Sequence, residues 1–575
     1  MEDKRTLFAF LAIGLIFLLL PYYNEWMGLN PTPLEEPTLE EALQAQDKSA
    51  EPVEGQPLQE LKQTPKLVPQ LQREPTSPTP QRLTREISEV ATSFTPIEIL
   101  VRTPLQELIL STEGGVITSC KLLKYNGIDQ DIVELIPQGG MGLGVYLQQA
   151  NERVDLSSIE FSSSQSNLRV EAGEERSLSL VAELDGGRRL EKVVTFYGDR
   201  YGVDLELRYE GFDDDTEAII AWENGIAFTE REPDIDLLET RAFAYINEER
   251  VELLLDDGEA ETWSDKGALK WAGIRNKYFL ISYIPSDSEQ RTSVFLSGDR
   301  QGTRLLPDYS IQVGRRLERS GSWKSTVYLG PLDYDELIDY NAELEQAIDF
   351  GWPIVSQVSR FLLILLIAAH QYIPNYGWLI VLFALVIKII VYPLTHKTYE
   401  SAARMQELQP KITALREKYE NDKQRLSRET MNLYKEEGVN PLGGCLPLLL
   451  QMPIFMSLYN LFSKTIELRQ APFTLWIQDL SLPDELFIAG FGLHVLPLLM
   501  SVSMFIQQKM TMKDPKQAML VYMMPVMMIF IFWSMSAGLV LYWTIFNVLT
   551  IGQQLLVNHL KKDAAKVDSI GPTNY

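Results

Sequence analysis

The chain has 575 residues, enough for several domains, and its 78 acidic and 52 basic side chains give a net charge of −26. The charge is uneven, because residues 24–350 hold 61 acidic and 31 basic side chains, whereas residues 351–575 hold 15 and 19 and are strongly apolar. An acidic block of this size excludes a nucleic-acid-binding protein, since it repels phosphate. The sequence therefore predicts an acidic soluble block joined to a membrane block.

Cysteine and histidine are too few and too scattered for several kinds of site. The two cysteines, Cys120 and Cys445, lie in different blocks, and all four histidines lie beyond residue 369. We therefore expect no disulfide framework, no zinc or other metal site, and no histidine-based catalysis in the acidic block.

The N-terminal region predicts a membrane anchor followed by a tether. Thr6–Leu20 is an apolar run with basic residues before it and aromatic residues after it. A cleavable signal peptide is the alternative, but no small-x-small cleavage site follows, so we predict an uncleaved anchor over residues 1–27. Residues 28–92 include ten prolines between positions 31 and 80 and predict an extended tether.

Residues 93–332 show the two-residue periodicity of β-strands. Ile97–Val101, Val193–Tyr197 and Val203–Leu207 read as short strands, and glycine pairs mark turns between strands. Many strands with few helical stretches predict a large all-β sandwich.

Residues 333–372 lead to the membrane block. Asp333–Ile348 reads as an acidic helix. Val355–Ala369 is apolar but covers only 15 residues and includes Ser356, Ser359 and Arg360. We therefore predict that it is an amphipathic helix lying in the membrane interface instead of spanning the bilayer.

Residues 373–560 predict a helical transmembrane core, which with the N-terminal anchor makes a bundle of six spans. Lysine and arginine gather in the segments that this count places in the cytoplasm, nine of them in 395–440. The positive-inside rule then places both termini in the cytoplasm and the β domain in the periplasm. A short cytoplasmic tail covers residues 561–575. The five core spans are Tyr376–Leu394, Leu446–Phe462, Leu486–Ile506, Met519–Trp533 and Leu539–Leu556.

Lys388 is the most informative residue, because it lies inside an otherwise apolar span. A lysine there costs about 2.5–3.5 kcal/mol on insertion scales, so it normally faces a polar cavity or partner. Snorkelling to the nearby headgroups is the alternative. Gln451 lies at a similar depth and favours the cavity. Thr544, Asn547 and Thr550 share one face of the last span and either line this cavity or form hydrogen bonds between helices.

The cytoplasmic segment 398–437 predicts a helical hairpin covered with charges. A solvated pair of helices without a function is one interpretation, and a capture arm at the mouth of the cavity is the other. Met519–Trp533 and Leu446–Phe462 are short for the bilayer and would thin it, which suits the insertion of proteins. The apolar residues of the hairpin are Leu408, Ile412, Leu415, Tyr419, Leu426 and Leu433.

Three other functions fit less well. A secondary transporter would show paired halves and intramembrane carboxylates, and an intramembrane protease would need a catalytic pair in the spans. A membrane-anchored carbohydrate-binding or scaffold protein would explain the β domain but leave Lys388 and the hairpin unexplained.

Several motifs resemble, in order, the YidC-type membrane protein insertases, in the form that has a large periplasmic domain. In the membrane block they are Tyr392-Pro-Leu-Thr, Leu408-Gln-Pro-Lys, Asp422-Lys-Gln-Arg, Asn440-Pro-Leu-Gly-Gly-Cys445, Gln451-Met-Pro-Ile-Phe, Glu467-Leu-Arg-Gln-Ala-Pro-Phe473 and Gly538-Leu-Val-Leu-Tyr542. In the acidic block they are Trp271-Ala-Gly-Ile-Arg-Asn-Lys-Tyr-Phe279, Tyr328-Leu-Gly-Pro331 and Asp349-Phe-Gly-Trp352.

The resemblance implies a non-enzymatic insertase and chaperone of the inner membrane, without a cofactor. Its expected fold is a five-helix core around a hydrophilic groove open to the cytoplasm, plus a β-supersandwich like that of sugar-binding proteins. Its expected partners are nascent membrane proteins, the lipid bilayer, the Sec translocon and, weakly because the tail is short, the ribosome. The family's groove cation is typically arginine, and Lys388 holds that position, which keeps the charge but loses the planar fork of donors.

Overall fold

The computed structural model describes residues 94–569 apart from positions 151, 232, 289–290, 302–306, 421, 439–445, 489–490 and 512–517. The predicted anchor (1–27) and tether (28–92) lie outside the described residues. The described chain forms two compact units, one of residues 410–438 and one of the remainder, and each is considered by itself.

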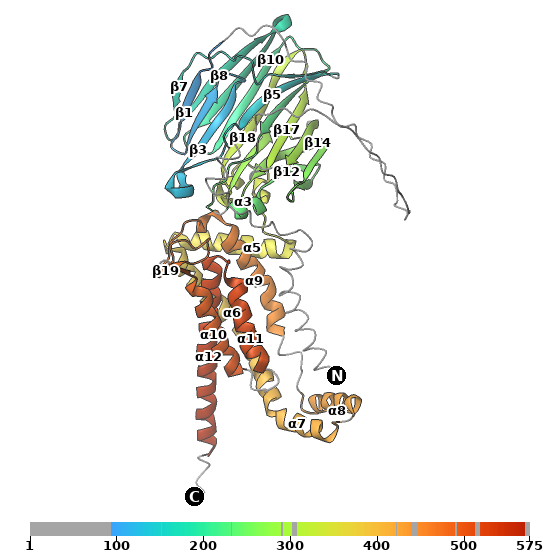
Figure 1. Ribbon diagram of the computed structural model, residues 1–575, viewed down its shortest axis with the longest axis vertical. Coiled ribbons are helices and arrows are strands. Elements are labelled where there is room, and N and C mark those ends of the chain that lie inside the picture. Colours follow the sequence, from blue (N-terminus) through green and yellow to red (C-terminus); the bar gives the residue numbers. More distant parts are fainter. Residues whose placement is uncertain are drawn as a thin grey trace, which may run out of the picture. The chain divides into compact units, whose positions relative to one another are not determined.

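The acidic block is built mainly of β-strands, as its two-residue periodicity predicts (Figure 1). The described strands are β1 (Glu98–Arg102), β2 (Gln106–Ser111), β3 (Val116–Asn126), β4 (Ile132–Glu134), β5 (Met141–Gln149), β6 (Glu152–Asp155), β7 (Asn167–Arg169), β8 (Glu175–Leu184), β9 (Arg188–Tyr197), β10 (Gly202–Glu210), β11 (Thr216–Glu223), β12 (Arg241–Ile246), β13 (Glu249–Leu253), β14 (Ala260–Arg275), β15 (Phe279–Pro285), β16 (Arg291–Asp299), β17 (Asp308–Arg316) and β18 (Ser320–Pro331). The three strands expected at 97–101, 193–197 and 203–207 are confirmed within β1, β9 and β10.

Strand β14 joins two sets of antiparallel strands. Its first part pairs with β16, in the register Ala260↔Asp299, and its last part pairs with β12 and β15. Buried and half-buried residues alternate along β2 and most of β9, because successive side chains point to opposite faces of a sheet. The Gly114-Gly115 pair turns the chain between β2 and β3 with positive φ at both residues, a conformation that glycine adopts without strain.

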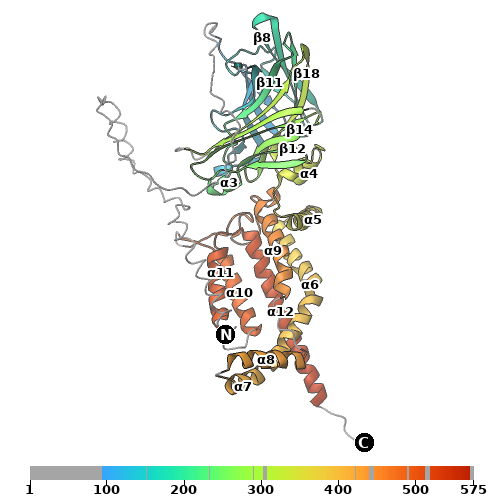
Figure 2. The ribbon, with the colours of Figure 1, turned by 90° about the vertical axis from the view of Figure 1, so that its right-hand side faces the viewer.

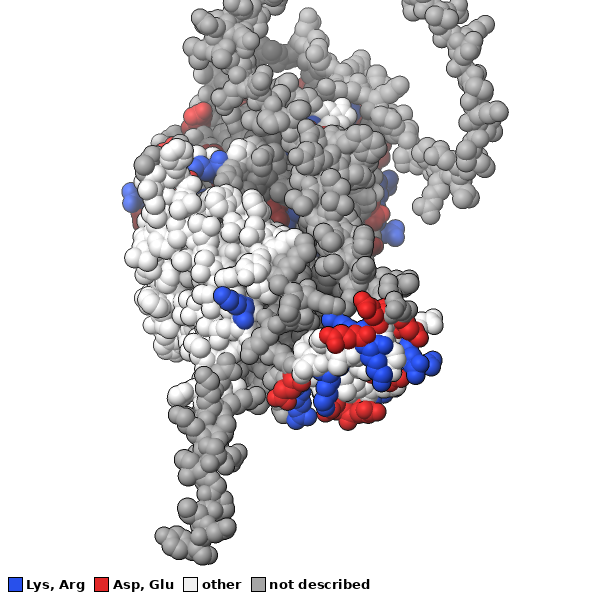
Figure 3. Space-filling model, turned by 60° about the horizontal axis from the view of Figure 1, so that its bottom comes forward, with Lys and Arg blue, Asp and Glu red and all other residues white. Residues whose placement is uncertain are grey.

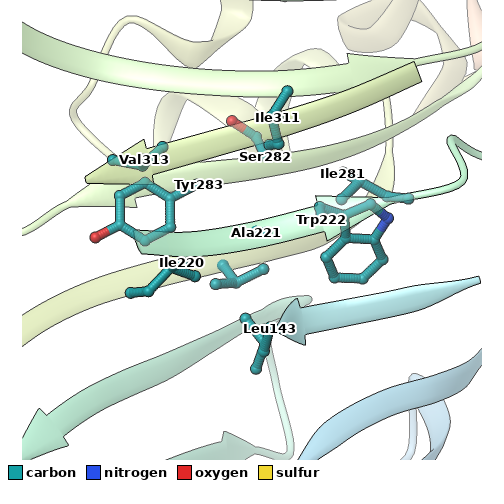
Figure 4. A pocket seen from close by; sticks show the side chains of 10 residues that line it. Leu143, Ile220, Ala221, Trp222, Ile281, Ser282, Tyr283, Ile311 and Val313 are labelled. Carbon is teal, nitrogen blue, oxygen red and sulfur yellow. The ribbon is translucent and has the colours of Figure 1, made fainter. Parts of the chain in front are cut away.

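The core of the β domain is aromatic and aliphatic. The ring of Trp271 is fully buried and lies edge-on to Phe243 and Tyr245, with centroids 5.0 and 5.8 Å away. A small pocket between the strands is lined by apolar side chains together with Ser282 and Tyr283 (Figure 4). The Ser282 hydroxyl already donates to the Ala272 carbonyl at 3.2 Å. The pocket is therefore a gap in the packing whose lining offers little to a sugar.

Lys192 on β9 is among the charged residues that are completely buried in this domain. Its ammonium donates to the carbonyls of Gly114, Gly115 and Leu143 at 2.8, 2.9 and 2.7 Å. Three acceptors match the three donors of the group, which compensates the loss of hydration. Lys192 thereby ties β9 to the turn after β2 and to the start of β5.

The acidic segment after β18 is not the single helix predicted over Asp333–Ile348. Helix α4 covers only Tyr334–Ile338, and a 3-10 turn follows at Leu344–Ala347. Asn341 and Glu343 between them have positive φ, which ends a right-handed helix. A short helix, α3 (Pro233–Glu239), precedes β12.

Helix α5 (Pro353–His370) runs crosswise to the helices of the membrane block (Figures 1 and 2). The Ser359 hydroxyl donates to the Ser457 carbonyl of α9 (Leu446–Lys464), and the Ser457 hydroxyl donates to the Val355 carbonyl. These reciprocal bonds fix α5 against α9.

The membrane block contains helices of very different lengths. They are α6 (Tyr376–Glu407), α9 (Leu446–Lys464), α10 (Val495–Thr511), α11 (Ala518–Phe532) and α12 (Ala537–Ser569). Within the described residues, Pro353–His370, Tyr376–Pro393 and Ala537–Val557 are long and apolar enough to cross a membrane. The predicted count of six spans is thus not confirmed.

The predicted span Leu486–Ile506 is wrong as a single helix. Residues Leu486–Ile488 (β19) and Phe491–Leu493 (β20) pair as an antiparallel hairpin, and helix α10 begins only at Val495. The run is mostly apolar and has no charged residue, so hydropathy alone did not separate a short hairpin from the first turns of a helix.

The unit of residues 410–438 contains two helices, and the first begins later than the hairpin predicted for residues 398–437. Helix α6 continues to Glu407, and the arms are α7 (Gln409–Lys418) and α8 (Lys423–Glu436). Lys411 pairs with Glu437 across the base, and the Asp422 side chain caps α8 by accepting from the Arg425 backbone N–H. We call these two helices the charged hairpin.

We expect Lys192→Met to lower the free energy of unfolding of the β domain by about 2–4 kcal/mol, because three buried carbonyls lose their donor. Urea titration of the full chain in detergent, read by protease resistance of the β domain, measures the change. Lys324→Met, at an exposed lysine of β18, should change it by less than about 0.5 kcal/mol. Equal effects of the two substitutions would refute the role given to Lys192.

Candidate functional site

Lys388 lies on α6 with its side chain inside the helix bundle, where it is 7% exposed. Its ammonium donates to the Thr550 hydroxyl of α12 at 2.6 Å and lies 4.6 Å from the centre of the Phe546 ring. No carboxylate among the described residues forms an ion pair with it. The lysine therefore holds its charge with one hydroxyl and one aromatic face, which is weak compensation for a buried cation.

The three polar residues predicted on one face of the last span are all buried on α12. The Thr550 hydroxyl accepts from Lys388 and donates to the Phe546 carbonyl, whereas the Thr544 hydroxyl donates to the Val540 carbonyl of its own helix. The Asn547 amide donates to the Ser503 hydroxyl of α10 at 3.3 Å. The Lys388–Thr550 bond joins α6 to α12 and the Asn547–Ser503 bond joins α12 to α10, so both are hydrogen bonds between helices. That these residues also line a cavity stays a prediction.

Gln451 lies on α9, which contacts both α6 and α12. Its side chain lies outside the described residues, so its predicted position beside Lys388 stays a prediction.

Sequence reasoning missed a second polar group, between α10 and α12. The Gln508 amide approaches the Met524 sulfur, and the Gln554 amide approaches the Met510 carbonyl. The buried amide oxygens of Gln508 and Gln554 have no hydrogen-bond partner in the described part of the chain, and the same holds for both amide atoms of Gln553. Paired glutamines at 507–508 and 553–554, each near the end of an apolar run, were the signal that could have revealed this group.

The apolar residues predicted in the charged hairpin are less buried than a core. Ile412 is buried, but Leu415, Tyr419, Leu426 and Leu433 are half-buried. Leu408 is also buried and lies between α6 and α7. The guanidinium of Arg425 lies 5.1 Å from the centre of the Tyr419 ring. Figure 3 shows acidic and basic side chains intermingled over the surface of this hairpin.

The loop that follows α9 is tied to the β domain by buried ion pairs. Arg469 donates to the Glu230 carboxylate at 2.7 Å, and the Gln470 amide donates to the Asn126 carbonyl. Lys464, at the end of α9, pairs with Glu239 at 3.1 Å and with Asp349 at 3.4 Å. This loop therefore lies on the same side of the membrane block as the β domain.

Glu467 in this loop, within the 3-10 helix Ile466–Leu468, is an unusual carboxyl group. Burial raises its pKa to about 8, with a smaller contribution from the negative charge of Asp333. Within the described residues no basic side chain pairs with it. At neutral pH this group is mostly protonated, so it is packed as a neutral acid.

Two family models match the chain in succession. A model described as the YidC periplasmic domain matches residues 98–363, and a model described as the 60Kd inner membrane protein matches residues 368–565. Together they cover the β domain and the helical block.

Relatives match nearly the whole chain. A membrane protein insertase YidC from Chlorobaculum parvum is 31% identical over 518 residues, which is 86% of this chain and 88% of that protein. Proteins of the same name from Syntrophus aciditrophicus and Geobacter metallireducens are 36% and 35% identical, each over 80% of this chain and 85% of their own length.

Solved structures give weaker likenesses. A crystal structure of an active YidC insertase covers 80% of this chain and 92% of its own at 19% identity and a TM-score of 0.35. A putative aldose 1-epimerase from Escherichia coli covers 41% of this chain and 99% of its own at 10% identity and a TM-score of 0.27.

A periplasmic β domain joined to a helical block of the inner membrane, with relatives of the same organisation over most of its length, defines a membrane protein insertase and not an enzyme. Its substrates are nascent membrane proteins, and it works in the lipid bilayer. The chain belongs to the YidC family.

The raised pKa of Glu467 predicts a pH-dependent stability. The ordinary pKa of a glutamate is about 4.3, whereas that of Glu467 in the folded chain is about 8. At pH values between these two, the folded chain keeps a proton on Glu467 that the unfolded chain has released. The stabilisation is fully present below about pH 4 and is lost as the pH rises through about 8.

We expect Glu467→Gln to reduce this loss, so its unfolding midpoint in detergent should fall less than that of the native chain between about pH 5 and about pH 9. Glu485→Gln, at an exposed glutamate between α9 and α10, should keep the native pH profile. A Glu467→Gln profile identical to the native one would show that Glu467 is not the titrating group.

Proposed function

We propose that the chain inserts nascent membrane proteins through a hydrophilic groove that opens to the cytoplasm, with Lys388 as its cation. The observation that supports this is the buried ammonium, held by Thr550 and Phe546 without a carboxylate among its described contacts. An acidic residue of a substrate at about 4 Å would be attracted by about 4 kcal/mol at an effective dielectric constant near 20. Lys388 therefore favours short acidic segments that must cross the membrane.

The contacts of Lys388 argue against snorkelling. A snorkelling lysine extends along its own helix toward the headgroups, whereas this ammonium bonds to Thr550, which is itself buried on another helix. The groove is lined by Thr544, Asn547 and Thr550 from α12 and by Gln451 from α9. Hydrophobic partitioning of the apolar span and the membrane potential supply the driving force.

The membrane topology belongs to the same proposal. Six spans, counting the N-terminal anchor, place both termini in the cytoplasm, which the lysine-rich segments between the helices support. Helix α5 lies in the outer interface, and its crosswise direction supports this (Figure 1). Helix α11, with 15 residues, is about 22 Å long against a hydrocarbon core of about 30 Å and so thins the bilayer. The two strand sets of the β domain form a sandwich.

The charged hairpin receives the substrate. Its half-buried apolar stripe, which includes Leu415, Tyr419, Leu426 and Leu433, offers a shallow surface for an apolar segment, and the surrounding charges keep it soluble. The Sec translocon and, weakly, the ribosome are further partners in this scheme.

We expect Lys388→Glu to slow insertion of a single-span substrate with a short acidic translocated tail by about tenfold or more, since an attraction of at least about 1.4 kcal/mol is lost and replaced by repulsion. Lys388→Arg should retain most of the activity, because it keeps the charge. Protease protection of the tail in native membranes measures the rate.

Two controls separate the groove from general damage. A substrate whose tail acids are replaced by amides should be affected much less by Lys388→Glu. Lys509→Glu, at an exposed lysine near the end of α10, should have a small effect with either substrate. An equal loss for acidic and neutral tails would contradict an electrostatic role for Lys388.

The order of contacts tests the capture role of the hairpin. A photo-cross-linker at the exposed Met431 of α8 should react with ribosome-bound nascent chains at shorter lengths than one at position 451, because capture precedes entry into the groove. A cross-linker at the exposed Leu254 of the β domain should react at neither stage. Cross-links at 451 with none at 431 would exclude the hairpin from the path.

A further inference from the structure

The hairpin of β19 and β20 presents an unusual apolar surface. Its two strands pair in the register Leu486↔Leu493, Phe487↔Gly492 and Ile488↔Phe491. The eight residues from 486 to 493 include no polar side chain. Phe487 is 68% exposed and Phe491 is 79% exposed. Aromatic side chains so exposed need a cover, because water is a poor environment for them.

The base of this hairpin is polar and well fixed. The buried Asp484 carboxylate accepts from the Val495 and Leu496 backbone N–H groups at 2.8 Å and from the Trp476 indole at 2.9 Å. It thereby caps the start of α10. The ring of His494 packs edge-on against Trp533 with centroids 4.6 Å apart. The hairpin therefore has a defined direction relative to α10, with its apolar residues beyond the polar base.

The hairpin lies on the periplasmic side of the membrane block. The loop that precedes it holds the ion pair Arg469–Glu230 and the bond from Gln470 to the Asn126 carbonyl, both with the periplasmic domain. Helix α10 leads away from the hairpin and exposes Leu499, Val502 and Ile506 along its length. The apolar surface of the hairpin thus continues into the surface that a membrane-embedded helix shows to lipid.

We propose that the β19–β20 hairpin rests in the outer leaflet of the bilayer with its backbone at headgroup level. The face that carries Ile488 and Phe491 then points toward the acyl chains, and the opposite face, with Phe487, stays in the headgroup region. The depth follows from the backbone. A two-stranded hairpin has two edges whose N–H and C=O groups find no partner in hydrocarbon, so the strands must stay where water and headgroups reach them. The Phe491 side chain extends from that level into the acyl region.

Lipid fits this surface better than a protein partner does. A protein partner could pair with the backbone edges of the hairpin, but residues 486–493 offer it no polar or charged side chain to fix the register of contact. Together with α5, the hairpin would hold the outer end of the bundle at a fixed depth. The inference does not depend on Lys388 or on the direction of insertion.

Fluorescence depth measurement tests the proposal. A chain with Cys445→Ser keeps one cysteine, Cys120, which is buried and unavailable for labelling. In this background, Phe487→Cys and, separately, Phe491→Cys are labelled with an NBD dye and reconstituted into nanodiscs that contain lipid only. Nitroxide lipids labelled at the headgroup or deep in the acyl chain, and aqueous iodide, serve as quenchers.

At Phe491→Cys we expect blue-shifted emission, strong quenching by the shallow nitroxide, weaker quenching by the deep one and little by iodide. At Phe487→Cys, on the opposite face, we expect quenching by the shallow nitroxide and the least by the deep one. Val502→Cys on α10 should show the opposite order of the two nitroxides, and the exposed Leu254→Cys of the β domain should respond to iodide alone. Iodide quenching without lipid quenching at 487 and 491 would overturn the proposal. Protection from all three quenchers would also overturn it, since it would mean a protein cover such as a second copy.

Discussion

Two buried lysines, Lys192 and Lys388, hold an amine away from water, which costs free energy unless other groups replace the lost hydration. Their surroundings replace that hydration to different extents. In the β domain, Lys192 meets three carbonyls that match its three donors. In the helix bundle, Lys388 meets one hydroxyl and one aromatic face. A fully bonded buried cation is a structural tie, whereas an incompletely compensated one needs water or a ligand. The two lysines therefore differ in how completely hydrogen bonds replace their hydration.

Sequence reasoning succeeded where a pattern is local. Two-residue periodicity located β1, β9 and β10, and an isolated lysine in an apolar run identified Lys388 before any contact was known. The positions of Thr544, Asn547 and Thr550 on one face of α12 also follow from helical spacing alone. Helical spacing does not predict which of them contacts Lys388. The Lys388–Thr550 bond joins residues 162 positions apart, so it depends on how α6 packs on α12.

It failed where conformation depends on tertiary contacts or on single backbone angles. Asn341 and Glu343 have positive φ, so the acidic segment does not continue as the single helix predicted over Asp333–Ile348. The residue types Asn and Glu alone give only a weak indication of positive φ. The run Leu486–Ile506 is mostly apolar, but Asp484 caps the helix eleven positions later, at Val495. Hydropathy does not detect a cap that comes from outside the apolar run. For this reason the sequence predicts a single span where the structure has a hairpin followed by a helix.

Polar groups along α10 and α12 are satisfied at one end and less so at the other. Near the periplasmic end, Asp484 caps α10, and the Ser501 hydroxyl donates to the Pro525 carbonyl of α11. Toward the opposite end, Gln508 and Gln554 keep buried amide oxygens without a described partner. Each completed bond resists opening, since losing it leaves a buried group unpaired. Unpaired amides on the inner side lower the cost of admitting water or a polar segment from the cytoplasm. In the proposed mechanism these amides, together with the incompletely compensated Lys388, would favour access from the cytoplasmic side of the membrane.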